Sequence, residues 1–156
     1  MANMCSNHLF LKGGKIKDFF DEMQRIAIEQ TTVEDGQFAF GIGEDPMFDV
    51  SIVQTNYIIY FATKWSPNID DLVKIARLKE FQFELGSEEL GNGIFTEYRF
   101  DGIELTERSL NSEELALVEW NDQKDAYMYN GEEVDCQTEQ YEKMLAEKPY
   151  LAVADN

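Results

Sequence analysis

The segment from Asn56 to Leu105 constrains the fold most strongly, because a strand, a capped helix and three further strands follow one another in it. Residues 57–63 place apolar side chains on both sides of an alternating pattern, which predicts a central strand covered on each face. Ser66-Pro67-Asn68 then supplies a helix cap and a proline suited to a first helical turn. The apolar spacing after this cap predicts one buried helical stripe, and residues 81–85 return to the period of a strand.

The dipeptide Asp101-Gly102 is the clearest hairpin signal, because both residues tolerate a positive φ. A two-residue turn at this point would pair Phe100 with Ile103 and Arg99 with Glu104. The second pair would form an exposed ion pair on the open side of the sheet, where Phe95 is also expected.

The N-terminal part adds a strand at residues 7–12, an amphipathic helix at 15–29 and a weakly alternating strand at 47–54. Residues 31–45 form a long glycine-containing connection that we expect to pack down on the domain. The resulting order predicts an α+β domain over residues 1–110, a ferredoxin-like α/β sandwich with two helices on one face of an antiparallel sheet. Trp65 is expected to anchor the core beside the second helix.

Residues 111–156 predict a C-terminal extension made of helices and a hairpin, packed on the domain. Asn111 or Ser112 can cap a short helix that is followed by an inward-facing Trp120. Asn130-Gly131 predicts a second tight hairpin, and Thr138 can cap a last helix.

Acidic residues dominate the chain, which has a formal net charge of −18, and residues 101–156 hold 15 acidic against 4 basic side chains. Such a charge repels nucleic acid and anionic membranes and favours a basic protein partner. The chain shows neither a signal-peptide pattern nor an apolar run of the ~20 residues that span a bilayer. Cys5 and Cys136 match no metal or redox spacing, so we expect reduced thiols in a cytoplasmic protein.

Three short motifs resemble the YubB-type ferredoxin-like domains of small plasmid, phage and mobile-element proteins. They are Cys5-Ser6-Asn7 at the first strand, Trp65-Ser66-Pro67 before the second helix, and Glu88-Glu89 followed by Gly91-Asn92-Gly93. Met4 stands where this family usually has an aromatic residue, and the resemblance covers about residues 1–106. It implies the same ferredoxin-like fold and imports no catalytic residue.

Candidate catalytic residues are few. His8 is the only histidine, which excludes multi-histidine metal sites, and we interpret it as a strand residue without a catalytic role. The glycines near residue 91 lack the lysine and helix of a phosphate loop, and no carboxylate cluster has EF-hand spacing. The sequence therefore predicts no catalytic residue, metal site or cofactor. The acidic side chains that we expect to contact a partner are Glu84, Glu88, Glu89, Glu97, Glu132, Glu133 and Asp135.

Two functional hypotheses follow. The first is a non-enzymatic protein-interaction module encoded by a mobile element, and its sharper form is a DNA mimic that occupies the nucleic-acid groove of a basic partner. The alternative is a small carboxylate-based enzyme, metal-assisted or acid–base, which requires carboxylates that converge on one pocket.

Overall fold

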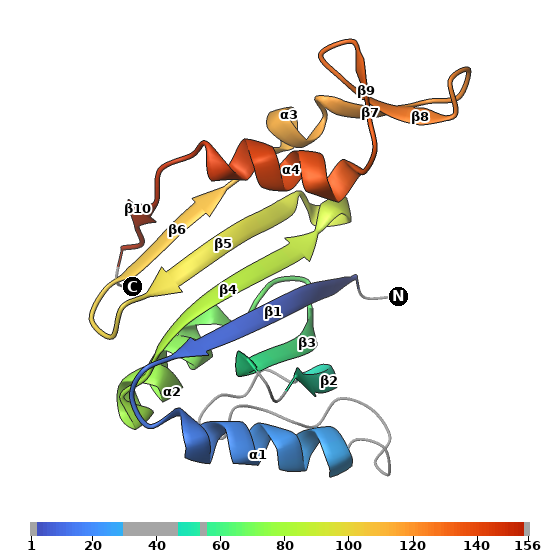
Figure 1. Ribbon diagram of the computed structural model, residues 1–156. Helices are drawn as coiled ribbons and strands as arrows, with labels where there is room; N and C mark the ends of the chain where they lie inside the picture. Colours follow the sequence, from blue (N-terminus) through green and yellow to red (C-terminus); the bar gives the residue numbers. More distant parts are fainter. Residues whose placement is uncertain (1–2, 30–46, 54–55, 155–156) are drawn as a thin grey trace.

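A computed structural model describes residues 3–29, 47–53 and 56–154 of the chain (Figure 1). Over these residues the protein forms ten strands, four helices and one 3-10 turn. In chain order the elements are β1 (Met4–Lys12), α1 (Ile16–Glu29), β2 (Phe48–Val53), β3 (Ile58–Lys64), α2 (Ile69–Lys79), β4 (Gln82–Glu89), η2 (Leu90–Asn92), β5 (Ile94–Phe100), β6 (Leu105–Ser109), α3 (Ser112–Leu115), β7 (Val118–Asn121), β8 (Ala126–Tyr129), β9 (Glu132–Val134), α4 (Gln137–Ala146) and β10 (Leu151–Ala152).

The main sheet has seven antiparallel strands in the order β10-β6-β5-β4-β1-β3-β2, and a separate sheet has the order β7-β8-β9. β1 lies between β3 and β4, so that Leu9 stands opposite Ile59 on one side and Leu85 on the other. Because side chains alternate along a strand, these three apolar residues point to the same face.

That face carries the larger hydrophobic core. Phe19 and Met23 of α1 and Leu72 of α2 belong to one buried cluster with Leu9 and Phe83 of the sheet. Both helices therefore cover the same side of the sheet. Fully burying one such side chain contributes about 1.5–3 kcal/mol, so this cluster is the main source of stability.

The opposite face is covered in part by the last third of the chain. Phe95 of β5 forms a second cluster with Leu115 of α3 and with Tyr141 and Leu145 of α4. The Tyr141 hydroxyl donates a hydrogen bond of 2.7 Å to the carbonyl oxygen of Leu115, which ties the two helices together. Phe95 was expected on an open surface and is instead 7% exposed, because α4 packs on it.

The expected two-helix ferredoxin-like α/β sandwich is wrong. The fold is β-rich, because the main sheet runs to seven strands and the described chain has four short helices and a further three-stranded sheet. The physical reason lies after Phe100, where hairpins continue and add β6 and β10 to the same sheet while α4 covers its second face. The division into residues 1–110 and 111–156 stays a prediction, and the long connection at 31–45 lies outside the described residues.

Three local expectations are also corrected. The Asp101 hairpin pairs Phe100 with Leu105, two residues later than expected, because the Asp101 carboxylate accepts hydrogen bonds from the backbone N–H groups of Ile103 and Glu104 and holds a longer loop. Trp65 is 53% exposed and is no core anchor. Trp120 was expected to face inward and is instead 49% exposed, because only Val118, the first residue of β7, is buried in the cluster with α4.

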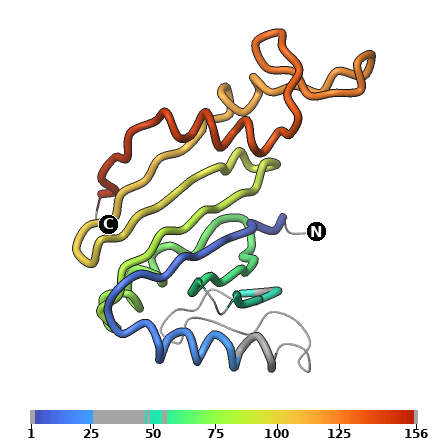
Figure 2. The backbone as a smooth tube through the Cα atoms, in the orientation of Figure 1, coloured from blue at the N-terminus to red at the C-terminus, as the bar shows by residue number. Residues whose placement is uncertain are grey.

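The described helices include none that is both long enough and apolar enough to cross a membrane. The tube view shows that α1 and the last third of the chain occupy opposite ends of the molecule (Figure 2).

Candidate functional site

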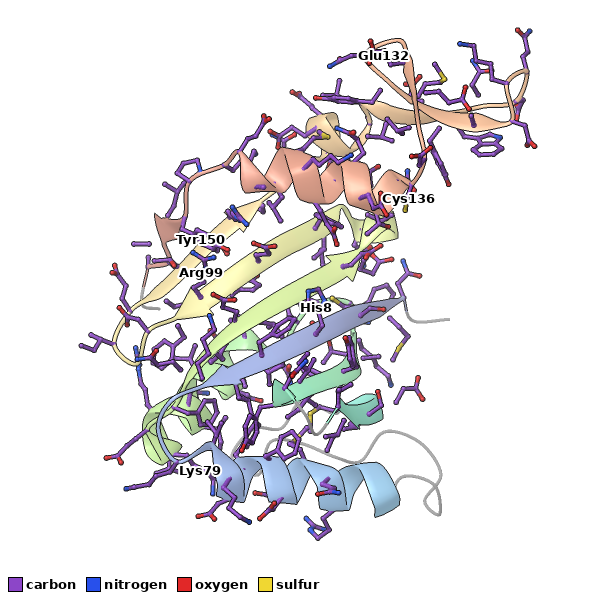
Figure 3. All side chains as sticks on the ribbon, viewed as in Figure 1. His8, Lys79, Arg99, Glu132, Cys136 and Tyr150 are labelled. Carbon is purple, nitrogen blue, oxygen red and sulfur yellow. The ribbon has the colours of Figure 1, made fainter. Side chains whose placement is uncertain are left out.

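A cleft of about 130 Å³ opens on the face of the main sheet opposite α1 and α2. We call it the His8 cleft. Strands β1, β4, β5 and β6 and the segment after α4 form it, and its polar lining includes His8, Glu84, Glu97, Arg99, Arg108 and Tyr150. Figure 3 shows His8 on the central strand, with Arg99 and Tyr150 close together toward the edge of the sheet.

His8 lies across a glycine of the neighbouring strand. It pairs with Gly86 in the β1–β4 register, and a Cβ atom at position 86 would stand 2.0 Å from the His8 Nε2 atom. Glycine weakens a strand interior, so its presence in central β4 indicates that the imidazole needs this space. The ring remains open to solvent on its other side and makes an edge contact with Phe10.

Partial desolvation over the sheet lowers the pKa of His8 below its usual value, although Glu97, Glu142 and Glu88 act in the opposite direction. His8 is therefore neutral at physiological pH, with one ring nitrogen able to donate and the other able to accept a hydrogen bond. Within the described part of the chain, neither nitrogen has a hydrogen-bond partner.

Glu97 is held by three donors on one oxygen. Its Oε2 atom accepts hydrogen bonds from Arg108 Nε at 2.7 Å and from the Tyr150 hydroxyl at 2.7 Å, and Arg108 Nη2 lies 2.6 Å away. Burial, followed by the hydrogen bond to Glu97, raises the pKa of Tyr150 to about 12. The hydroxyl therefore stays protonated and keeps donating at any physiological pH.

The Tyr150 ring lies against two guanidinium groups. The Cζ atoms of Arg99 and Arg108 are 4.1 Å and 4.6 Å from the ring centroid, which is cation–π distance. Arg99 also pairs with Glu84 at 3.2 Å, and Lys12 pairs with the same carboxylate oxygen at 2.7 Å. These contacts fix the positions of the charged groups around the cleft.

A smaller hollow of about 40 Å³ continues from the His8 cleft toward α4. It shares His8 and Glu97 with the cleft and adds Glu88 of β4 and Glu142 of α4 over an apolar floor that includes Phe95. His8 thus stands between two adjoining hollows on the same sheet face.

The second distinct feature is the three-stranded sheet β7-β8-β9, which we call the arm (residues 118–135). It extends away from the main sheet at the end opposite α1 (Figure 1). Trp120 and Tyr127 face each other across β7 and β8, with ring centroids 5.0 Å apart, and Trp120 Nε1 donates a hydrogen bond of 3.0 Å to Asp122. The arm holds six acidic residues and one lysine, a net charge of −5.

The structure divides the acidic residues predicted for partner binding into three places. Glu132 and Glu133 lie on β9, and Asp135 follows directly, so these three are together in the arm. Glu84 and Glu97 are engaged in ion pairs at the cleft, and Glu88 lines the hollow beside it. Glu89 caps the 3-10 turn by accepting a hydrogen bond from the Asn92 backbone and lies apart from both sites.

Sequence reasoning missed Arg99, Arg108 and Tyr150 as members of one site. The shifted register of the Asp101 hairpin places Glu97 opposite Arg108, a pairing that the expected two-residue turn excludes. Tyr150 comes from the far end of the chain, and no spacing pattern signals its return to the sheet. Among residues 3–29, 47–53 and 56–154, no three His, Cys, Asp or Glu side chains are grouped to hold a metal ion.

No family model, curated protein or solved structure shows significant similarity to the chain.

Proposed function

We propose that the protein is a non-enzymatic interaction module that binds an arginine- or lysine-rich segment of a partner protein through the arm. The observation that carries this proposal is the arm itself, a sheet whose Val118 packs in the second hydrophobic cluster but which extends beyond the main sheet and presents a half-exposed Trp120 among carboxylates. Tryptophan, tyrosine and carboxylate groups are the side chains that bind cationic side chains most favourably.

The strand register supports a two-sided recognition surface. Trp120 and Tyr127 share one face of the arm with Glu132, while Glu119 and Glu133 point to the other face. A basic segment laid along the aromatic face would stack on Trp120 and pair with Glu132. Each exposed cation–π contact contributes about 0.5–1 kcal/mol and each exposed ion pair about 0.2–1 kcal/mol, so several must act together.

The resemblance of the Cys5-Ser6-Asn7 and Trp65-Ser66-Pro67 motifs to YubB-type proteins supports, as part of the same proposal, an origin on a mobile element. A partner in that setting would belong to the host cell or to the element itself, and its contacting segment would carry positive charge.

Tryptophan fluorescence tests the proposal. The chain has two tryptophans, so Trp65→Phe leaves Trp120 as the single reporter on the arm. A short synthetic peptide of alternating arginine and glycine, titrated at about 0.15 M salt, should change the Trp120 emission saturably. The triple variant Trp120→Ala/Glu132→Gln/Glu133→Gln lacks this reporter, so its binding is measured by calorimetry. It should bind the peptide at least about tenfold more weakly than the parent protein does, a loss of about 1.4 kcal/mol.

The control removes two charges at the other end of the molecule. Asp18→Asn/Glu22→Gln in α1 changes the net charge as much as Glu132→Gln/Glu133→Gln does, and α1 lies opposite the arm. If the peptide loses equal affinity in both double variants, general charge attraction explains the binding and the arm has no special role.

A further inference from the structure

The His8 cleft differs in charge from the rest of the chain. Its charged lining is Arg99 and Arg108 with Glu84 and Glu97, a local charge of zero in a chain of net charge −18. Two of the 13 basic residues therefore line this one place on the sheet, and Lys12 pairs with Glu84 from beside it. Because the two carboxylates of the lining are balanced by arginines, the cleft repels a negative or electron-rich group less than the rest of this acidic chain does.

The two arginines of the cleft differ in what they can still bind. Arg108 is largely buried and donates to Glu97 and to the Ala146 carbonyl oxygen. Arg99 is half exposed. Its Nε atom contacts Glu84, and its guanidinium group lies against the ring of Tyr150. In the described part of the chain, the terminal nitrogens of Arg99 donate no hydrogen bond, so they are available as the paired donors that a carboxylate accepts best.

His8 supplies the second recognition element. Its ring is neutral, lacks a hydrogen-bond partner among the described residues and lines the same cleft as Arg99. Keeping the ring in this position requires glycine at position 86, a residue that weakens a strand interior. A role in binding accounts for a strand glycine kept beside an imidazole that has no hydrogen-bond partner among the described residues.

We propose that the His8 cleft binds a small organic carboxylate, with its carboxylate on the terminal nitrogens of Arg99, a hydrogen bond from the His8 ring, and its apolar part against Phe10. The volume of about 130 Å³ is well below the ~300–1,000 Å³ of pockets for drug-sized ligands, so the ligand is small. This site is independent of the arm and of the basic partner proposed above.

Three isosteric probes distinguish the chemistry: benzoate, the neutral benzamide and the cationic benzamidine. His8 is the only histidine, so its ring C–H signals in NMR report on the cleft without assignment of the whole protein. Benzoate should shift these signals saturably, and benzamide should bind at least about tenfold more weakly, or about 1.4 kcal/mol. Equal binding of benzamide, tighter binding of benzamidine through Glu84 and Glu97, or no saturable shift with benzoate would overturn the proposal.

Two variants complete the test. Arg99→Gln should weaken benzoate binding about tenfold or more, whereas Lys124→Gln, which removes the same charge from an exposed position between β7 and β8, should leave it unchanged. Equal losses in the two variants would show that benzoate responds to net charge alone. Wild-type titrations with the three probes decide the question even if Arg99→Gln destabilises the sheet.

Discussion

Replacing Gly86 by alanine should displace the His8 ring. The added Cβ would stand 2.0 Å from Nε2 and 2.1 Å from Cε1 of His8, distances at which atoms overlap. The backbone at Gly86 has an ordinary negative φ, so alanine meets no conformational strain there. The three atoms nearest to the added Cβ all belong to the His8 imidazole, so the ring must turn outward into water.

The size of the effect follows from two opposing contributions. Moving the ring forfeits its edge contact with Phe10, about 0.5–1.5 kcal/mol, and any off-rotamer strain adds about 0.5–1.5 kcal/mol. Alanine in place of glycine returns about 0.5–1 kcal/mol by reducing the entropy of the unfolded chain. In a His8→Ala background there is no ring to displace, and only the entropy gain of alanine over glycine remains. Gly86→Ala should therefore stabilise the protein in that background. The coupling between the two positions is then the sum of the two losses, about 1–3 kcal/mol.

Urea denaturation of the wild type, the two single variants and the double variant measures this coupling directly. NMR titration of His8 in Gly86→Ala gives a second readout, because a ring released into water should recover a pKa near 6.5. An identical stability change for Gly86→Ala with and without His8, together with an unchanged His8 pKa, would refute the steric account of this strand pair.

Three further predictions concern stability and reactivity. The pKa of His8 is lower in the folded chain than its ordinary 6.5, so the unfolded chain binds a proton on this ring more readily. The free energy of unfolding should therefore fall as the pH drops through about 6.5. Urea melts of His8→Gln should lack that part of the pH dependence. Cys5 is 0% exposed, and burial raises the pKa of its thiol to about 11. A disulfide reagent should therefore modify Cys136 alone until urea unfolds the protein, and mass spectrometry would detect this. Tyr141→Phe removes the donor to the Leu115 carbonyl and should cost about 1–2 kcal/mol in the same melts, whereas a loss below 0.5 kcal/mol would mean that water replaces the bond.

Local patterns predicted individual elements better than their assembly. The Asn130-Gly131 turn forms as expected with both residues at positive φ, because this dipeptide determines the hairpin by its own backbone preferences. The expected Asp101 hairpin was wrong by two residues, because the hydrogen bonds that the Asp101 carboxylate accepts from the backbone compete with the two-residue turn. The fold class was wrong because periodicity gives no information on how many later strands join the same sheet.

The candidate cleft shows the same limit. His8 and Glu97 could be placed on one sheet face from alternation alone, but the contact with Tyr150 joins residues 53 positions apart and depends on α4 reversing the chain. Gly86 could have signalled the cleft, since a strand glycine often marks a close approach of another group, but the expected strand ended at residue 85 and β4 in fact runs to Glu89.

Ion pairing separates the structural carboxylates from those available for binding. Glu97 forms an ion pair with Arg108, and Glu114 forms one with Lys148. Lys148 Nζ also donates a hydrogen bond to the Ser109 carbonyl oxygen. These two carboxylates therefore secure the C-terminal segment. In contrast, Glu132 and Glu133 have no ion-pair partner within the described part of the chain, so the arm keeps its full charge. Salt screens exposed charges far more than paired, partly buried ones. Raising ionic strength should therefore weaken peptide binding by the arm while leaving the urea midpoint almost unchanged, and a parallel loss of both would show that the two sets of carboxylates are not distinct.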